Sequence, residues 1–144
     1  MKVTIEEMPG AELEIILRCP VADERVRSLA ARLTALSEER IAVRAGEEIQ
    51  LLEPDKVLYA EAVEGSAFVY TEDAVWPTRL TLSEMENMSE GFFRCSKSMV
   101  VNLRRIERLR SGLNGRLIAT LANGEKILIS RHYAAPIRWA LLNG

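Results

Sequence analysis

Hydrophobic and polar positions alternate with two different periods along the chain, and the first 45 residues combine both. The pattern predicts a strand over Glu12–Arg18 and a short strand over Arg40–Arg44. Between them, apolar residues recur at helical spacing over Asp23–Ser37, which predicts an amphipathic helix. A strand–helix–strand unit of this size buries little apolar surface alone. We therefore expect it to pack on the rest of the chain or on a second copy.

Beyond Gly46 the chain becomes a series of short strands separated by turn residues. The first strands are expected at Glu48–Leu52, Val57–Val63, Phe68–Thr71 and Ala74–Trp76. A short helix is expected over Thr81–Met88, capped at its start by Thr81 or Ser83, because hydroxyl side chains can accept from the free backbone N–H groups of a first turn.

Two Asn-Gly pairs, Asn114-Gly115 and Asn123-Gly124, are flanked by alternating apolar residues. Asn and Gly tolerate the two positive φ values of a type I′ hairpin turn. The pairs therefore predict a three-stranded meander from about Ile106 to Ile129. A closing helix is expected over Tyr133–Leu142, with Pro136 in its first turn, where the missing N–H costs little.

Together these elements predict an α+β fold that is mostly β. We expect a small unit over residues 1–45 that serves dimerisation or regulation, and a multi-stranded domain over residues 46–144. A chain of 144 residues, 48% hydrophobic and 28% charged, can form a real core, and this composition argues against disorder.

The sequence also favours a cytoplasmic protein. No apolar run approaches the ~20 residues that a membrane helix needs, and the residues after Met1 form no apolar signal core. The two cysteines, Cys19 and Cys95, are spaced neither as a CxxC motif nor as a disulfide framework. A reducing compartment fits this usage.

Charge is distributed unevenly along the chain. Residues 1–90 hold 9 Lys or Arg and 19 Asp or Glu, a net of −10, whereas residues 91–144 hold 10 and 2, a net of +8. A basic segment on an acidic body is typical of a polyanion-binding face. Charges that meet inside one fold would produce the same asymmetry.

Enzyme signatures are absent from the sequence. His132 is the only histidine, and there is no Gly-rich loop after a strand, no metal-spaced His/Cys cluster and no nucleophile elbow. We expect no catalytic residue, no metal and no cofactor, so an enzyme is the weakest interpretation.

The C-terminal part carries a more distinctive pattern. It reads Phe93-Arg94-Cys95-Ser96-Lys97-Ser98-Met99-Val100-Val101-Asn102-Leu103, then Ile106, the two Asn-Gly pairs and Ile129-Ser130-Arg131-His132-Tyr133. This pattern resembles the LytTR family of bacterial DNA-binding domains, which runs F-x-R-x-H-x-S-x-x-V-N-L-x-x-I, an N-G hairpin and S-R-x-Y. The resemblance extends over about residues 49–142, with Glu61-Ala62 and Gly65 where members carry E-A-x-G-N-Y.

The resemblance implies an elongated, mostly β fold that inserts loops into successive major grooves of double-stranded DNA. By the resemblance, Lys97 and Arg131 contact bases. Both side chains can pair with the acceptors of guanine, and each such contact contributes about 1–3 kcal/mol of discrimination. Phosphate contacts that set register are expected from Arg94, Ser98, Arg104 and His132.

A third contact loop maps to Gly65-Ser66-Ala67, with base contacts expected from Ser66 and Ala67. The chain departs from the family here and at Ser96, which replaces the His of R-x-H-x-S. Ser66 and Ala67 replace the usual Asn-Tyr or His, so this loop can supply at most one hydroxyl contact, and we expect its base preference to be weak or different from that of the family.

Several of these residues also have structural alternatives. Arg94 can pair with a carboxylate and Asn102 can bond backbone at a turn. Lys97 can be a solvated lysine and Arg131 part of an ion pair. Cys95, beside basic residues, is either an oxidant-sensing thiol or a small buried apolar residue.

The resemblance favours a bacterial transcription regulator like a response regulator but without a receiver domain, because 45 residues cannot hold one. Two tandem half-sites on DNA favour two linked reading heads, so we expect a homodimer. By the same resemblance, a small membrane protein is a further expected partner. The alternative function is a β-rich module that binds a protein or a small ligand.

Overall fold

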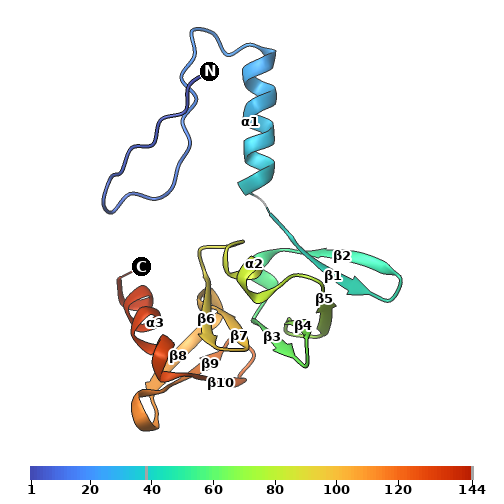
Figure 1. Cartoon of the computed structure of the whole chain (residues 1–144), viewed down its shortest axis with the longest axis vertical. Helices are drawn as coiled ribbons and strands as arrows, with labels where there is room; N and C mark the ends of the chain where they lie inside the picture. The colour runs from blue at the N-terminus through green and yellow to red at the C-terminus, as the bar shows by residue number, and fades with distance from the viewer. Residues whose placement is uncertain (38, 144) are drawn as a thin grey trace. The chain divides into compact units, whose positions relative to one another are not determined.

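The computed structural model of the chain describes residues 1–37 and 39–143, which form two compact units, Met1–Glu38 and Glu39–Gly144 (Figure 1). The first unit contains the helix α1, Glu24–Ser37. Asp23 caps it, because its Oδ1 accepts from the backbone N–H of Val26 at 3.0 Å. The predicted helix is thereby confirmed.

The predicted strand over Glu12–Arg18 is wrong. Residues 1–23 form neither helix nor strand. A strand needs a partner for its backbone hydrogen bonds, and the described part of this unit contains no other strand. Leu13, Ile15 and Ile16 are consequently 86%, 66% and 63% exposed.

The second predicted strand of the N-terminal unit belongs to the other unit. Strand β1, Ile41–Ala45, pairs with β2, Glu48–Leu52, as an antiparallel hairpin. Gly46 turns this hairpin at a φ of +64°. The strand–helix–strand arrangement is therefore corrected to a lone helix followed by a hairpin, with the two compact units dividing after Glu38.

An antiparallel five-stranded sheet lies at the centre of the second unit. Its strands are β3 (Tyr59–Val63), β4 (Ser66–Tyr70), β5 (Val75–Thr78), β6 (Phe92–Ser96) and β7 (Met99–Asn102), in the order β5-β4-β3-β7-β6. Pro77 lies in the edge strand, where a missing N–H is tolerated. Helix α2, Leu82–Glu86, begins with the expected cap, since Thr81 Oγ1 accepts from Glu84 N at 3.1 Å.

The predicted meander is confirmed as a separate three-stranded sheet. It consists of β8 (Ile106–Ser111), β9 (Leu117–Leu121) and β10 (Lys126–Ile129), in the order β10-β9-β8. Asn114 and Gly115 have the two positive φ values expected, +59° and +78°. In the second turn only Gly124 has a positive φ, +86°. That turn is a type I turn closed by a left-handed glycine, so the prediction of type I′ there is wrong.

Helix α3, Arg131–Asn143, begins two residues earlier than expected. Pro136 therefore lies inside the helix, beyond the first turn, and leaves one i→i−4 bond unmade. Ala134 and Ile137 face the core. Trp139 lies off that face and is 68% exposed.

The five-stranded sheet contributes to two cores, one on each face. Tyr59 and its cross-strand partner Val101 join a cluster with β9, β10 and α3, whereas the neighbouring pair Ala60 and Val100 joins a cluster with β1, β2 and α2. Successive residues of a strand point to opposite faces, which explains the division. The expected α+β, mostly β fold class is confirmed.

Candidate nucleic-acid interface

Two turns lie at the same end of the five-stranded sheet. Strand β3 ends before the turn at Glu64 and Gly65, and β7 begins after the turn at Lys97 and Ser98. The two strands are antiparallel neighbours, and the backbone N–H of Ala62 donates to the carbonyl of Ser98 at 2.8 Å. The expected contact loop at Gly65-Ser66-Ala67 is therefore adjacent to the turn that carries Lys97.

The Lys97 turn also opens onto a hollow of about 910 Å³. It is lined by Lys97, Asn114, Arg116, Ser130, Arg131, His132 and Tyr133. These residues come from the β6–β7 turn, the β8–β9 turn and the start of α3. The backbone N–H of Ser130 donates to the carbonyl of Cys95 at 2.9 Å, which holds the first helical turn beside β6. The structure thus brings together the two residues expected to contact bases.

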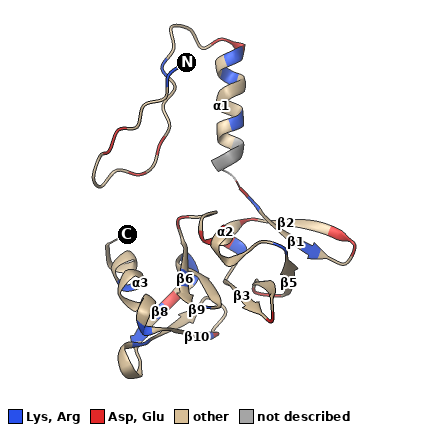
Figure 2. Ribbon diagram, in the orientation of Figure 1, with Lys and Arg blue, Asp and Glu red and all other residues tan. Residues whose placement is uncertain are grey.

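The hollow is basic. Lys97, Arg116 and Arg131 are exposed, and among residues 1–37 and 39–143 none of the three forms an ion pair. Figure 2 shows basic ribbon at the start of α3 and acidic ribbon at the β1–β2 turn. Unpaired cations around a concave surface attract a polyanion.

Ser66 and Ala67 do not line this hollow. They lie with Arg44 and Arg79 in a second hollow of about 670 Å³, between the β1–β2 hairpin and the end of the five-stranded sheet. Ser66 is exposed, whereas Ala67 packs against the second core. Of the two, Ser66 is therefore the one whose side chain can reach a partner.

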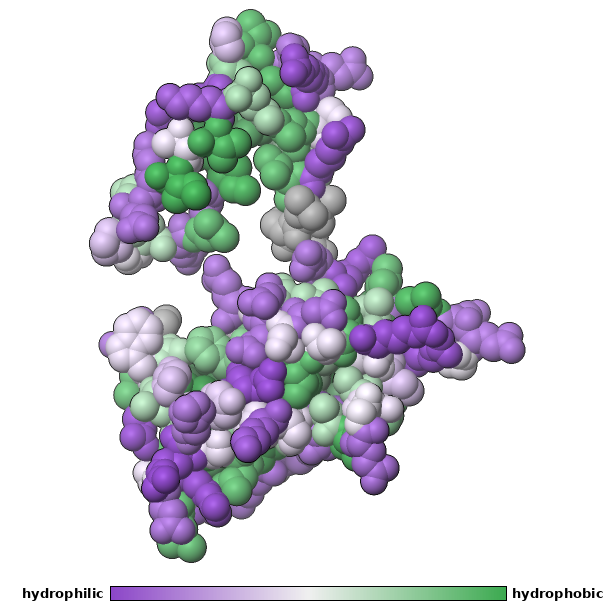
Figure 3. Space-filling model, in the orientation of Figure 1, coloured by the Kyte–Doolittle hydropathy of each residue, from purple (hydrophilic) through white to green (hydrophobic). Residues whose placement is uncertain are grey.

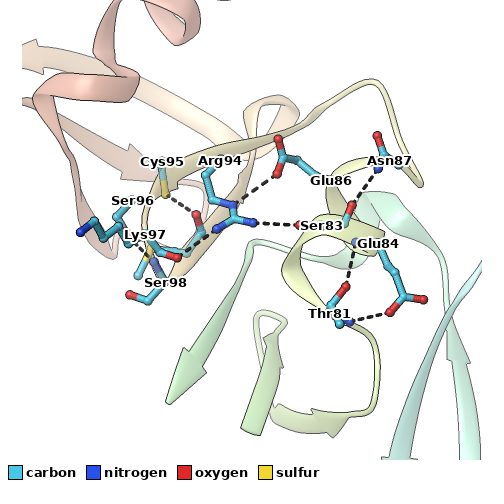
Figure 4. A network of polar contacts seen from close by, with 11 residues as sticks. Thr81, Ser83, Glu84, Glu86, Asn87, Arg94, Cys95, Ser96, Lys97 and Ser98 are labelled. Carbon is cyan, nitrogen blue, oxygen red and sulfur yellow. Dashed lines mark hydrogen bonds and ion pairs between the residues drawn. The ribbon is translucent and has the colours of Figure 1, made fainter. Parts of the chain in front are cut away.

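Arg94 has a structural role. Its guanidinium donates to Glu86 Oε1 at 3.3 Å, to Ser83 Oγ at 3.3 Å and to the Lys97 carbonyl at 2.9 Å. Figure 4 shows these contacts and the Lys97 side chain pointing away from them. Arg94 thus fixes the backbone of the turn that carries Lys97, and the structural alternative accounts for its position.

The other residues expected to contact phosphate do not all lie at the same end of the sheet. Ser98 is exposed in the β6–β7 turn, and His132 is exposed with its ring edge-on to Tyr133 at 4.8 Å between centroids. Arg104 follows β7, at the opposite end of the sheet from the Lys97 turn, and pairs with Asp55 at 3.5 Å. The structure does not bring Arg104 together with the hollow.

Asn102 and Cys95 serve the fold. Asn102 is 2% exposed; its side-chain amide donates to the carbonyls of Pro54 and Val57, and its Oδ1 accepts from Arg104 N. The thiol of Cys95 is 0% exposed, and burial raises its pKa to about 12. A thiol that stays protonated and covered is a poor oxidant sensor, so the apolar alternative accounts for Cys95.

Sequence reasoning missed Asn114 and Arg116. The Asn-Gly signal identified their turn as a hairpin, but hairpin chemistry does not say which part of the molecule the turn faces. The signal that could have found Arg116 is its position, because it is a cation directly after this turn, and the strands β9 and β10 that follow it lead to Arg131.

Gly115 provides a test of how Arg131 is positioned. A Cβ at Gly115 would lie 2.9 Å from Arg131 Cγ, so alanine must displace the arginine stem. Gly124 has a similar φ with nothing within 4 Å of its Cβ position. We expect Gly115→Ala and Gly124→Ala to lower the free energy of unfolding alike, by about 1 kcal/mol.

Only Gly115→Ala is expected to weaken DNA binding as well, which fluorescence anisotropy with a labelled duplex would measure. Equal affinity of the two variants for the duplex would contradict this account of Arg131.

Most of the second unit is similar to known proteins. Residues 47–142 match the family model of the LytTr DNA-binding domain. The chain is 27% identical over 103 residues to the sensory transduction protein LytT of Bacillus subtilis and 24% identical over 97 residues to that of Enterococcus faecalis. These matches cover 70% and 66% of this chain but 43% and 40% of the relatives, so the chain spans less than half of their length.

The fold has a counterpart among solved structures. A LytTr DNA-binding domain from Bacillus cereus superposes with a TM-score of 0.66 at 23% identity, covering 74% of this chain and 98% of that one. Within the described ranges, no cluster of His, Cys, Asp or Glu could hold a metal, and no helix is long and apolar enough to cross a membrane.

Proposed function

Because the chain belongs to the LytTR family of DNA-binding domains, we propose that it is a sequence-specific regulator of transcription that binds double-stranded DNA. The observation that carries the proposal is the basic hollow, which combines Lys97, Arg116 and Arg131 from three separate segments. Basic side chains in this setting supply both phosphate attraction and base recognition.

The proposed contacts are of two kinds, contacts to bases and contacts to phosphates. Lys97 and Arg131 enter a major groove and read base edges, while Ser98, His132 and Arg116 bond phosphates beside it. The adjacent β3–β4 loop, through Ser66, reaches the next groove. Arg94 contributes indirectly, because its hydrogen bond to the Lys97 carbonyl fixes the turn that carries Lys97.

The proposal is tested by gel shift of the purified chain against the DNA upstream of its own gene, with unlabelled competitor. Retention of the complex over a hundredfold excess of unrelated DNA is expected. Displacement at equal concentrations of specific and unrelated competitor would contradict sequence specificity.

We further propose that residues 1–38 mediate homodimerisation in the cytoplasm and are the point of control, including by a small membrane protein. The exposed Leu13, Ile15 and Ile16 support this, because apolar side chains left uncovered in one copy can be buried by another. Sedimentation of the full chain and of a chain lacking residues 1–38 should give a dimer and a monomer. Unchanged association would contradict the proposal.

One observation favours a second candidate function, a small-ligand-binding module. The 670 Å³ hollow is lined mainly by apolar side chains, with Arg44 and Arg79 among its residues, and this combination suits an organic anion. Binding of 1-anilinonaphthalene-8-sulfonate that Ala67→Leu abolishes, with no gel shift on DNA, would favour this candidate over the regulator.

A further inference from the structure

The outer face of the three-stranded sheet carries a regular arrangement of cations. Arg108, Thr120 and Lys126 are directly opposite one another across β8, β9 and β10. Arg110 lies on β8 two residues after Arg108 and opposite Ile118, so its side chain is on the same face of the sheet. Successive residues alternate faces in a strand, so these side chains leave the sheet on the side opposite the buried Leu117, Ala119 and Leu121.

These cations are free to meet a partner. Arg108, Arg110 and Lys126 are all exposed, and none is in an ion pair among the described residues. The three strands contain one carboxylate, Glu107, and the nearby Glu125 accepts a hydrogen bond from Tyr59. The face is therefore net positive. We call Arg108, Arg110 and Lys126 the outer basic face.

The outer basic face continues from the hollow. At one end of this sheet, Arg116 directly precedes β9 and Arg131 follows the end of β10. Strand β8 ends at the same place with Ser111, and Arg110 is the residue before it. Arg108 and Lys126 lie two residues further along their strands, about 7 Å at the rise of a strand. Cations thus follow one another along β8 from the end of the sheet that faces the hollow, whereas Ile118 and the half-exposed Leu128 lie between the hollow and Lys126 on β9 and β10.

We infer that the outer basic face contacts the phosphate backbone of DNA that flanks the segment read in the hollow. The inference rests on the proposed function. A duplex strand presents one phosphate per ~3.4 Å of its axis, so a run of cations of this length passes several phosphates. Exposed arginine and lysine on a regular sheet carry no base-reading geometry, so the contact adds affinity and register without sequence preference.

The test measures how the affinity of the full chain for a 40-base-pair duplex from its own upstream region depends on salt. The variant Arg108→Gln/Arg110→Gln/Lys126→Gln is compared with the wild type and with Arg40→Gln/Lys56→Gln/Arg138→Gln, which removes three exposed cations that line neither hollow. Each phosphate contact contributes about 0.9 to the magnitude of the slope of log K against log salt. We expect the outer-face variant to reduce the magnitude of the slope by about 2 to 3, and the control variant to leave it unchanged.

A second measurement, the ratio of specific to unrelated affinity, tests the proposed function independently of this inference. The outer-face variant should keep the wild-type ratio of specific to unrelated affinity, and Arg108→Lys/Arg110→Lys should keep the slope, which excludes misfolding as the cause. An unchanged slope in the glutamine variant, with wild-type binding intact, would overturn the inference alone. A wild-type chain that does not bind the duplex would overturn both.

Discussion

Replacing Lys97 and Arg131 with alanine is expected to abolish sequence preference while leaving the fold intact. Each contact contributes about 1–3 kcal/mol of discrimination between bases, so each single variant should lose about ten- to hundredfold of its preference for the specific site. Both side chains are exposed and unpaired among the described residues, so their loss removes no core contact. Anisotropy with specific and unrelated duplexes would measure the ratio of the two affinities.

Arg138 provides a matched control for this experiment. It is an exposed arginine on α3, as is Arg131, but it does not line the hollow. Arg138→Ala should therefore keep the ratio. Specificity unchanged in both Lys97→Ala and Arg131→Ala would contradict the assignment of these residues.

Asn102→Ala is expected to destabilise the second unit by about 3 kcal/mol, which is a large share of the stability of a small domain. The side chain is buried and makes three hydrogen bonds, at 2.9 to 3.2 Å, to backbone groups of Pro54, Val57 and Arg104. Alanine leaves these groups without that partner and adds a small cavity. Urea denaturation would measure the free energy of unfolding.

Asn123 is the control for Asn102. Its Oδ1 accepts from Glu125 N at 3.0 Å, but the residue is exposed in a turn, where water can replace the bond. Asn123→Ala should cost about 1 kcal/mol or less. Equal losses in the two variants would show that burial does not decide the contribution of Asn102.

Local signals predicted most elements of the second unit, because strand alternation and turn chemistry act within a few residues. The strand at Glu48–Leu52 and the cap at Thr81 need only their own neighbourhood. The strand expected at Glu12–Arg18 has an equally good local pattern, but pairing requires a partner strand, and the described residues of the first unit contain none. The prediction of a type I′ turn at Asn123-Gly124 was wrong because two turn types accept the same dipeptide.

The candidate site was predictable only in part. The resemblance to a family supplied Lys97 and Arg131, but no spacing in the sequence places residues 34 positions apart around one hollow. Their proximity depends on the Ser130–Cys95 backbone bond and on the β8–β9 turn reaching α3. Figure 3 shows how hydrophilic and hydrophobic residues are interspersed on the visible surface, and such a pattern does not mark the site.

Selection of bound duplexes from a random pool tests the central claim most directly. The full chain and Lys97→Ala/Arg131→Ala would each be taken through several rounds, and the recovered DNA sequenced. The account predicts that the wild type enriches one motif, repeated in tandem, and that the variant recovers DNA without that motif. Recovery of unenriched DNA by the wild type, or of the same motif by both proteins, would contradict it.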